Sequence, residues 1–435
     1  MKHLLKILLL VLVGFHQNMN SQQALDKQFD SIAEIGDEYL SRLTELKNFN
    51  GVVLLKKGDE IVLRKAYNIS RDTSSTLFVM ENSQFDLRSV AKLFAKISVL
   101  KLEQEQKINR KHSISEYIPD FPNGAQITIE HLMTNSSGLP REFKNGDIAY
   151  RELQPGQIIE LAKKENLEFK PGSKEQYSNV GFQLLYYIIG EINGSSFHEY
   201  LEEQVFKPLG MHSSGSNFGS DENLKNAYAF GHYLGKDKEI ICECAFPSDE
   251  MRMGNLYSTV GDLDSFLAHL NKEDHQDLIV DGSISHAGGT RGKRAYIERN
   301  FADDYSIVFL ANYDAIPFEQ LVKDLQDILN GKSVEMPKAI ERKVAEVPVE
   351  ILKKYEGTYD LVDAGHIMLT IRLENDNLYV YQKGENNGIL YPENETTFFG
   401  DKNSKESVEF VQDENGDYYM LLDFQGVQWK GIKIE

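Results

Sequence analysis

Eight residues set the architecture that the rest of this sequence predicts: Phe85-Asp86-Leu87-Arg88-Ser89-Val90-Ala91-Lys92. Apolar residues continue from them at spacings of three and four, which predicts a helix from Ser89 to about Glu105. Positions i and i+3 share a helix face, so the first turn places the Lys92 amine beside the Ser89 hydroxyl. A serine becomes a nucleophile when a base takes its proton. The positive end of the helix dipole and burial both lower a lysine pKa toward the range that a base needs.

The same pattern, a serine followed three residues later by a lysine, occurs again at Ser98-Val99-Leu100-Lys101. Nine residues at about 100° each place Ser98 on the opposite side of the predicted helix from Ser89. Ser98 also falls in the helix interior, where its hydroxyl meets only carbonyls of the preceding turn. The spacing therefore favours Ser89 as a nucleophile. The alternative is a serine that only caps the helix.

A second run, Tyr177-Ser178-Asn179, is the only Tyr-x-Asn in the chain. It lies between a turn at Pro171-Gly172 and a helix predicted over about 180–190, where side chains can project into a cleft. A phenol beside an ammonium group can relay a proton to a leaving group. The Asn179 amide donates and accepts, so it can bridge the lysine and a substrate amide. Alternatively, Tyr177 is a core aromatic residue and Asn179 caps the helix.

A third run, His286-Ala287-Gly288-Gly289, precedes a strand predicted over Gly292–Arg299. Glycines allow a substrate carbonyl to approach the backbone closely. The Gly289 N–H can then form one arm of an oxyanion hole, with the Ser89 N–H as the other arm. The alternative is a glycine-rich turn before a strand, which requires no function.

The order of predicted elements indicates an α+β protein. We expect a helix over about 25–47, a β-hairpin over 51–63, several helices up to about residue 329, and two late strands at Gly292–Arg299 and Ser306–Leu310. This order fits helices packed on an antiparallel sheet whose strands come from both ends of the chain. After Tyr355, short runs rich in aromatic and β-branched residues alternate with polar turns. That pattern predicts a small, all-β antiparallel barrel.

The domain boundaries predicted from these patterns are a signal peptide at 1–21, a first folded domain at 22–335, a linker at 336–350 and the barrel at 351–435. Lys2 and Lys6 give the first residues a positive charge. The apolar run that follows them, 7–15, is too short to span a bilayer. This is typical of a secretory signal, although a buried N-terminal helix is the alternative. We therefore expect a periplasmic or secreted protein with no stable membrane span after signal removal.

The composition of the chain argues against several classes of binding partner. Acidic residues outnumber basic residues by 67 to 47, and the net charge of −20 repels phosphate backbones and anionic lipids, so no nucleic-acid partner is expected. The two cysteines, Cys242 and Cys244, form no zinc pattern. A disulfide across one intervening residue would be strained, so we expect both thiols to be buried or idle. No cluster has metal-ligand spacing, and we expect no metal and no cofactor.

Together these runs resemble the serine β-lactamase, penicillin-binding protein and esterase family, in particular the branch with class C β-lactamases, D-alanyl-D-alanine carboxypeptidases and D-aminopeptidases. Three further segments support the resemblance: HLMTNSSGLP at 131–140, KPLGM at 207–211 and GNLYSTVGDL at 254–263. The resemblance covers about residues 30–330. The segment after Tyr355 is similar to the lipocalin-like barrel often appended to such hydrolases.

The resemblance implies a β-lactamase/transpeptidase-like fold and a role for each residue of the three runs. Ser89 corresponds to the acylated nucleophile, and Lys92 and Tyr177 to the proton-transfer pair. The substrate-side groups correspond to Asn179, His286, Gly288 and Gly289.

The chain departs from the β-lactamase pattern at one of these runs. Where β-lactamases usually carry Lys-Thr-Gly, this sequence has His286-Ala287-Gly288, which is closer to some carboxypeptidases and D-aminopeptidases. The lysine charge and the threonine hydroxyl, both of which favour a substrate carboxylate, are absent. Arg291 is a possible substitute for that charge.

The expected function is therefore that of a secreted serine hydrolase that forms an acyl-enzyme on Ser89. It would cleave small-molecule or peptide acyl substrates, namely esters or amides of D-amino-acid-type peptides, as an esterase, D-alanyl-D-alanine carboxypeptidase or D-aminopeptidase does. A class C-type β-lactamase is an alternative. An alternative of another class is a non-catalytic penicillin-binding or sensor protein on the same scaffold, and a third interpretation makes the barrel the main ligand binder.

Overall fold

The computed structural model describes residues 28–144, 153–216, 218, 224, 227–235, 239–245, 253–339, 342–364, 366–402, 405–424 and 427–434. Within these residues the chain forms two compact units. The first comprises residues up to 315 together with 328–332, and the second comprises 316–327 together with 333 onward. Each unit is described by itself below.

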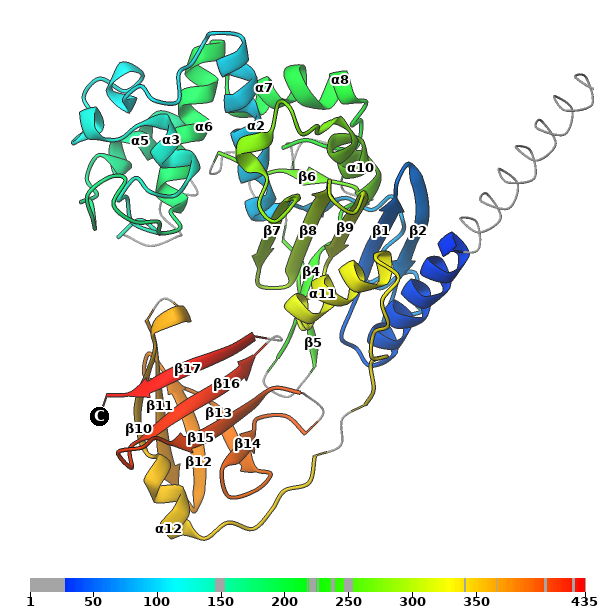
Figure 1. Cartoon of the computed structure of the whole chain (residues 1–435), viewed down its shortest axis with the longest axis vertical. Coiled ribbons are helices and arrows are strands. Elements are labelled where there is room, and N and C mark those ends of the chain that lie inside the picture. The colour runs from blue at the N-terminus through cyan, green and yellow to red at the C-terminus, as the bar shows by residue number, and fades with distance from the viewer. Residues whose placement is uncertain are drawn as a thin grey trace, which may run out of the picture. The chain divides into compact units, whose positions relative to one another are not determined.

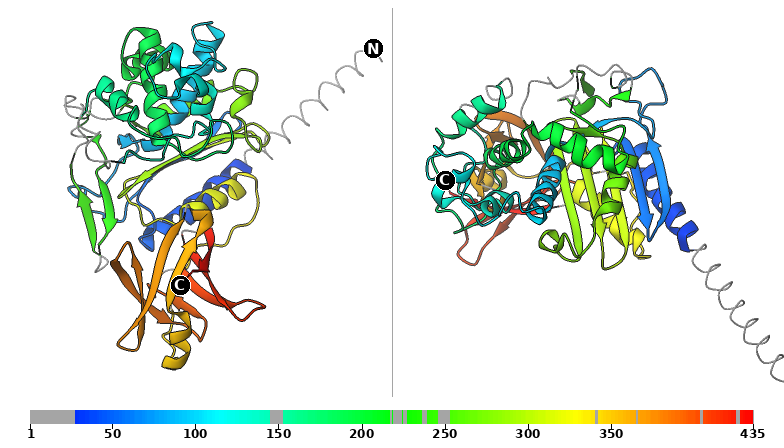
Figure 2. Two further views of the ribbon diagram at one scale, coloured as in Figure 1. Left: turned by 90° about the vertical axis from the view of Figure 1, so that its left-hand side faces the viewer. Right: turned by 90° about the horizontal axis from the view of Figure 1, so that it is seen from above.

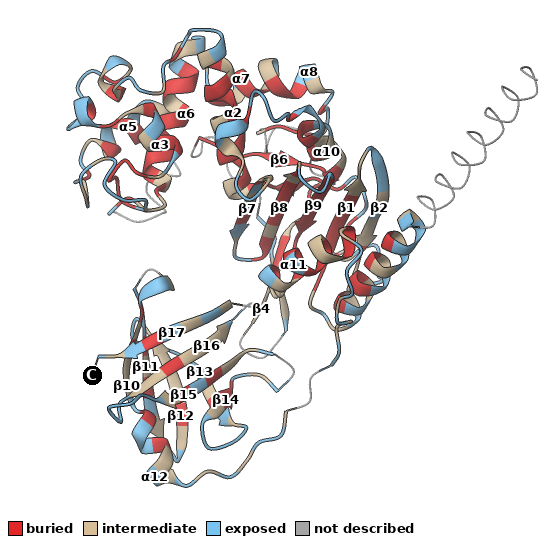
Figure 3. Cartoon of the chain, viewed as in Figure 1, coloured by how far each residue is buried: buried red, intermediate tan, exposed pale blue. Residues whose placement is uncertain are grey.

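An antiparallel sheet with the strand order β2-β1-β9-β8-β7 forms the centre of the first unit. Its strands are β1 (Gly51–Lys57), β2 (Glu60–Tyr67), β7 (Ser283–Thr290), β8 (Lys293–Asn300) and β9 (Tyr305–Ala311). The N-terminal hairpin β1-β2 joins the late strands because β1 pairs with β9 from Gly51↔Ala311 to Lys57↔Tyr305. Figure 2 shows this blue hairpin beside the yellow-green strands in one sheet. Every residue of β9 is buried, and Figure 3 shows the central strands as the most buried part of the sheet.

Helices surround this sheet. They are η1 (Arg88–Val90), α2 (Ala91–Gln104), η2 (Ile114–Glu116), η3 (Gly124–Gln126), α3 (Ile129–Met133), α5 (Pro155–Ala162), α6 (Asn179–Asn193), α7 (Phe197–Leu201), η4 (Glu202–Phe206), α8 (Lys207–Leu209), α10 (Val260–His269) and η5 (Gln276–Leu278), besides a helix over 28–45. Helix α10 packs on β1, β8 and β9. Helix α6 contacts α2, α3, α5 and α7, and these helices gather beside the β7 edge of the sheet (Figure 1).

Short strands complete the first unit: β3 (Phe85–Asp86) pairs with β6 (Tyr257–Ser258), and β4 (Gly231–Leu234) pairs with β5 (Ile240–Glu243). Helix α2 buries an apolar face that includes Phe94, whose ring stacks on Phe266 of α10 with centroids 4.1 Å apart. This contact joins the helix that begins beside Ser89 to the helix that covers the sheet.

The second unit contains a closed antiparallel barrel of eight strands. They are β10 (Gly357–Leu361), β11 (Ile367–Glu374), β12 (Asn377–Gln382), β13 (Glu385–Pro392), β14 (Thr397–Phe399), β15 (Ser407–Gln412), β16 (Tyr418–Phe424) and β17 (Val427–Lys433). The unit also contains η6 (Lys353–Tyr355), η7 (Val362–Ala364) and α12 (Val349–Leu352), while α11 (Phe318–Leu329) spans its boundary with the first unit. Tyr355 and Phe410 stack in the barrel core with ring centroids 4.2 Å apart.

The predicted fold class is confirmed: an antiparallel sheet with flanking helices is followed by an all-β barrel. One local alternative is wrong. The run His286–Gly289 precedes the strand β8 as expected, but it is not a turn, because it lies inside β7, the strand at the edge of the sheet. Glycines favour turns in a sequence pattern, but an edge strand accepts them where another backbone must come close.

The cysteine prediction is also wrong. Cys242 is only partly buried at β5, Cys244 is exposed, and a disulfide joins them. None of the helices in the described ranges is long and apolar enough to cross a bilayer. The predicted signal peptide, 1–21, lies outside the described residues.

Candidate active site

Ser89 lies in the single turn of η1, directly before α2 begins at Ala91. The Lys92 Nζ donates a hydrogen bond to the Ser89 Oγ at 3.1 Å. Lys92 is buried, with 3% of its surface exposed. The helical spacing of three therefore places the amine beside the hydroxyl, in an environment with little water.

Tyr177 comes to the same point from the loop before α6. Its hydroxyl oxygen lies 2.7 Å from the Ser89 Oγ, and the Lys92 Nζ lies 5.0 Å from the centre of its ring. The Lys92 amine and the Tyr177 phenol thus both lie within hydrogen-bond distance of the Ser89 hydroxyl.

Ser178, the residue after Tyr177, holds this loop in place. Its hydroxyl accepts the Gly181 N–H at 2.9 Å and donates to the Pro140 carbonyl at 2.8 Å. Its own N–H donates to the Asn135 side chain at 3.1 Å. Asn135 and Pro140 both belong to the segment at 131–140, so that segment serves to fix the loop that carries Tyr177. The helix cap is Ser178, and Asn179 is the first residue of α6.

Strand β7 approaches Ser89 from the other side at Gly288. A Cβ built on Gly288 would overlap the Leu87 carbonyl oxygen and lie 3.1 Å from the Ser89 nitrogen. Only glycine allows this approach of strand and helix start. Gly289 follows in the strand and pairs with Arg294. The backbone N–H groups of Ser89 and Gly289 therefore belong to segments in close contact.

His286 lies two residues before Gly288 and carries no charge at neutral pH. Its surroundings displace water and lower its pKa to about 4, an effect that the neighbouring Lys96 and Lys92 strengthen. The ring is still partly accessible to solvent, and its Nδ1 lies 2.7 Å from the Ala287 carbonyl oxygen. A carbonyl only accepts, so we assign the proton of the neutral ring to Nδ1.

The Asn179 side chain contacts a residue that the sequence patterns did not single out. Its Nδ2 donates to the Glu142 Oε1, while its Oδ1 is buried and accepts no hydrogen bond within the described residues. Glu142 stands two residues after Pro140 in the sequence. A carboxyl group so close to that segment was the available signal, but one acidic residue in a loop is not distinctive.

Two further cations, Arg291 and Lys96, lie in sequence near the residues of this site. The Arg291 guanidinium stacks on Tyr233, 3.5 Å from the ring centre. This contact directs the side chain to β4, and no contact of Arg291 with His286 is found in the described part of the chain. Lys96 lies one helical turn after Lys92 and is half-buried; burial lowers its pKa, and the charge of Glu175 partly opposes this.

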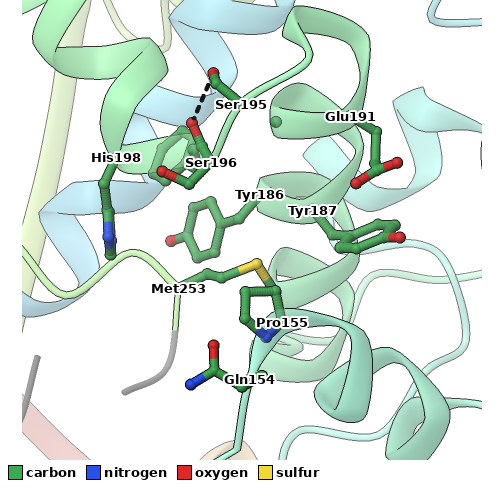
Figure 4. Close-up of a pocket in the computed structure, with 11 residues that line it drawn as sticks. Gln154, Pro155, Tyr186, Tyr187, Glu191, Ser195, Ser196, His198 and Met253 are labelled. Carbon is green, nitrogen blue, oxygen red and sulfur yellow. Dashed lines mark hydrogen bonds between the residues drawn. The ribbon is translucent and has the colours of Figure 1, made fainter. Parts of the chain in front are cut away.

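Two cavities lie beside this arrangement. A small one of about 10 Å³ borders Lys92, and its wall includes Gln183, Tyr186 and Met253. A larger one of about 260 Å³ shares the Tyr186 and Met253 walls and lies among α5, α6 and α7 (Figure 4). Ser89, Lys92 and Tyr177 do not line the larger cavity. Its His198 accepts the Gly254 N–H at 3.2 Å, and burial lowers the pKa of this histidine to about 4.

The described residues offer no set of side chains that could bind a metal ion. Among the residues that the structure describes, no group of three or more His, Cys, Asp or Glu side chains is arranged to hold a metal ion. The chemistry that the site supports on its own residues is nucleophilic attack by a serine assisted by an amine and a phenol.

Comparison with known proteins defines the class. The family model described as Beta-lactamase matches residues 39–280, more than half of the chain, and the chain belongs to this family. The resemblance expected from the sequence motifs is thereby confirmed. The family and the fold are those of serine hydrolases.

Particular relatives extend the match beyond this region. Penicillin-binding protein 4* of Bacillus subtilis (strain 168) is 25% identical over an alignment that covers 90% of this chain and 97% of that protein. The octameric penicillin-binding protein homologue from Pyrococcus abyssi shares 22% identity with a TM-score of 0.59, covering 90% of this chain and 97% of that one. The D-amino acid amidase from Ochrobactrum anthropi SV3 has 15% identity and a TM-score of 0.59, covering 69% and 99%. The two structural matches show a shared fold.

Proposed function

We propose that this protein is a secreted serine hydrolase that acts through an acyl-enzyme on Ser89. The observation that carries the proposal is the convergence at Ser89 Oγ of the Tyr177 hydroxyl at 2.7 Å and the Lys92 amine at 3.1 Å. A hydroxyl with two proton-transfer groups in reach is the arrangement that activates a serine.

The reaction follows from these positions. The Ser89 Oγ attacks the carbonyl carbon of an ester or amide, and its proton passes to the Lys92–Tyr177 pair. The carbonyl oxygen gains negative charge, which the N–H groups of Ser89 and Gly289 stabilise. The bond to the leaving alcohol or amine then breaks, and the pair returns the proton to that leaving group. Water attacks the acyl-enzyme with the same proton transfers, which releases the acid and restores the Ser89 hydroxyl.

The proposed substrates are esters or amides of D-amino-acid-type peptides. His286 is neutral at physiological pH because its pKa is lowered to about 4, and Ala287 offers no hydroxyl. The strand that faces Ser89 therefore supplies neither the fixed charge nor the hydroxyl that favours a substrate carboxylate. This supports a leaving group without a carboxylate, such as an alcohol, ammonia or an amine. A structurally similar protein is a D-amino acid amidase.

The proposal extends to the whole chain. We assign residues 1–21 to a signal peptide, 22–335 to the hydrolase domain, 336–350 to a linker and 351–435 to an accessory barrel. Export to the periplasm or the medium follows from the signal. A substrate that reaches the site is then a small molecule or a peptide fragment.

A substrate panel tests the function and its main alternative. Purified protein is assayed on p-nitrophenyl esters, D-alanyl peptides, D-amino-acid amides and nitrocefin, with Ser89→Ala as the control. Turnover of esters or D-amides well above nitrocefin supports the proposal, whereas fastest turnover of nitrocefin supports a β-lactamase. No turnover of any of them, with a stable adduct of labelled penicillin on Ser89, would indicate a sensor.

A further inference from the structure

A buried charged cluster includes Asp86 and Arg88, which closely precede Ser89 in the chain, and the reaction proposed above does not use it. The Asp86 carboxylate is buried, and its Oδ2 lies 3.0 Å from the Arg88 Nε and 3.5 Å from the Lys293 Nζ. Lys293 is also buried and donates to the Tyr228 hydroxyl at 2.7 Å. One carboxylate thus faces two cations in a region with little water. Removing such charges from water costs free energy, and a role for the backbone nearby would account for the cluster.

The cluster surrounds a residue with an unusual backbone conformation, Arg88. Arg88 has a φ of +49°, in the left-handed region that side chains other than glycine rarely adopt. Its N–H donates to the Asp86 Oδ1 at 3.1 Å, while its guanidinium faces the Oδ2 of the same carboxylate. One side chain therefore holds both the main chain and the side chain of a strained residue. Strained backbone persists only where its surroundings hold it in this way.

Asp86 is itself fixed to the rest of the unit. It lies in β3 and pairs with Tyr257 of β6, and the next residue, Leu87, donates its N–H to the Leu256 carbonyl at 2.8 Å. Lys293, on β8, ties the carboxylate to the central sheet. The left-handed turn at Arg88 is therefore anchored to two sheets.

The residue that follows this turn is Ser89. Its N–H belongs to the first turn of a helix, where N–H groups have no acceptor within the helix. The left-handed φ of Arg88 sets the direction from which the chain enters Ser89, at the point where a Cβ built on Gly288 would lie 3.1 Å from the Ser89 nitrogen. A change of φ at Arg88 would rotate this peptide away from β7.

We propose that Asp86 is a positioning residue, which holds Arg88 in the left-handed conformation and so orients the Ser89 hydroxyl and N–H for acylation. The inference rests on the proposed function, because it assumes that Ser89 is the acylated residue. It assigns to Asp86 and Arg88 an effect on the rate of acylation that acts through the orientation of Ser89.

The decisive comparison is Arg88→Gly against Arg88→Ala. Both variants lose the same guanidinium group, but glycine adopts a positive φ freely and alanine does not. Acylation is followed with a fluorophosphonate probe that carries a fluorophore, over a range of probe concentrations. We expect the maximal acylation rate of Arg88→Ala to be at least tenfold below that of Arg88→Gly. The probe concentration at half-maximal rate should differ by less than threefold, because the orientation of Ser89 changes and the binding surface does not.

A second comparison tests whether the effect of Asp86 on acylation depends on the left-handed conformation of Arg88. Asp86→Asn is combined with Lys293→Met, which keeps the buried charge balanced, and is made with either Arg or Gly at position 88. With Arg88 present, we expect an acylation rate at least tenfold below that of Lys293→Met alone. With Gly at 88, the matching loss should be less than threefold, because no strained residue then needs the carboxylate.

The outcomes separate this inference from the function on which it rests. Equal acylation rates of Arg88→Gly and Arg88→Ala, or equal losses from Asp86→Asn in both backgrounds, would overturn the inference and leave the hydrolase proposal standing. Absence of any adduct on Ser89 of the unaltered protein would overturn both. The comparison at position 88 leaves Asp86 and Lys293 intact, so it decides the matter even if the Asp86 variants fail to fold.

Discussion

The same helix carries two serines that are each followed by a lysine three residues later, and the two pairs have opposite fates. At the start of α2, Ser89 meets the Lys92 amine and the Tyr177 hydroxyl. About two turns into α2, Ser98 is fully buried and donates to the Phe94 carbonyl at 2.7 Å. Its lysine, Lys101, donates instead to Gln204 on another helix.

Even a tyrosine is present near the second serine. Tyr200 lies in the core near Ser98, and burial raises its pKa to about 12, with Glu105 adding to the rise and Ser98 opposing it. The residue types at the two places are therefore alike, but only the first is at a helix N-terminus with a glycine strand beside it. Position and access, more than residue identity, distinguish a reactive serine from a structural one.

The largest effect that this contrast predicts is that of Ser89→Ala. Covalent labelling by a fluorophosphonate should fall by at least about 10³-fold, because the attacking oxygen is lost. Intact-mass spectrometry measures the adduct, and the melting temperature checks the fold. Ser98→Ala is the matched control and should label normally, with a stability loss of about 1 kcal/mol from its hydrogen bond to Phe94. Labelling retained in Ser89→Ala would end the assignment of the nucleophile.

The next effect separates the two lysines. Lys92→Met removes the amine beside Ser89 and should slow ester hydrolysis by about 10²- to 10⁴-fold, the range for loss of a general base. Lys101→Met removes an amine that donates to Gln204 and should change the rate by less than about twofold. Initial rates at saturating substrate provide the measurement. Similar losses from both changes would show that the pairs are not distinguished as described.

A smaller effect is expected from the strand that faces the first serine alone. In Gly288→Ala, the added methyl overlaps the Leu87 carbonyl and displaces β7 from Ser89, so acylation should fall by about 10²-fold. In Gly289→Ala, the methyl meets the flexible Arg294 side chain at 3.2 Å, and the loss should be several times smaller. Acylation rates of the two variants, with circular dichroism to check folding, compare them. The reverse order would contradict the contact described for Gly288.

The smallest effect is the pH dependence of stability that His286 contributes. The folded-state pKa of His286, about 4, lies below its ordinary value of 6.5. Between these values the unfolded chain binds a proton that the folded protein does not, so stability falls as the pH drops from about 6.5 to about 4. We expect this histidine to contribute on the order of 1 kcal/mol, since its ring keeps some access to water. Urea unfolding at about pH 7 and pH 5 measures the loss, which should be smaller in His286→Asn. An unchanged pH dependence in that variant would contradict the lowered pKa.

Much of the site was predictable because it depends on local patterns. The helix period predicted Lys92 beside Ser89 and Ser98 on the opposite side of the helix, and both follow from 3.6 residues per turn. The barrel was predictable from the aromatic and β-branched runs after Tyr355, although β13 gives no such signal because Gly388 and its polar residues break the alternating pattern.

The rest depends on contacts between distant segments. Glycines at 288 and 289 left a turn open as an alternative, and the approach of η1 explains why a strand contains Gly288. The contact of Asn179 with Glu142 and the ion pair of Asp86 with Arg88 leave no distinctive local signal in the chain. A left-handed arginine is equally invisible, because the sequence pattern there favours an ordinary helix start.

The pairing of β1 with β9 has a consequence for synthesis of the chain. The partner of Gly51 is Ala311, and roughly 250 residues separate the two strands. At about 5–20 residues per second, a ribosome needs on the order of 10 to 50 s to deliver β9 after β1 has emerged. During that interval the hairpin exposes an unpaired edge, the kind of surface that recruits other chains. Fragments that end before Tyr305 lack the middle strand altogether, and we expect them to aggregate.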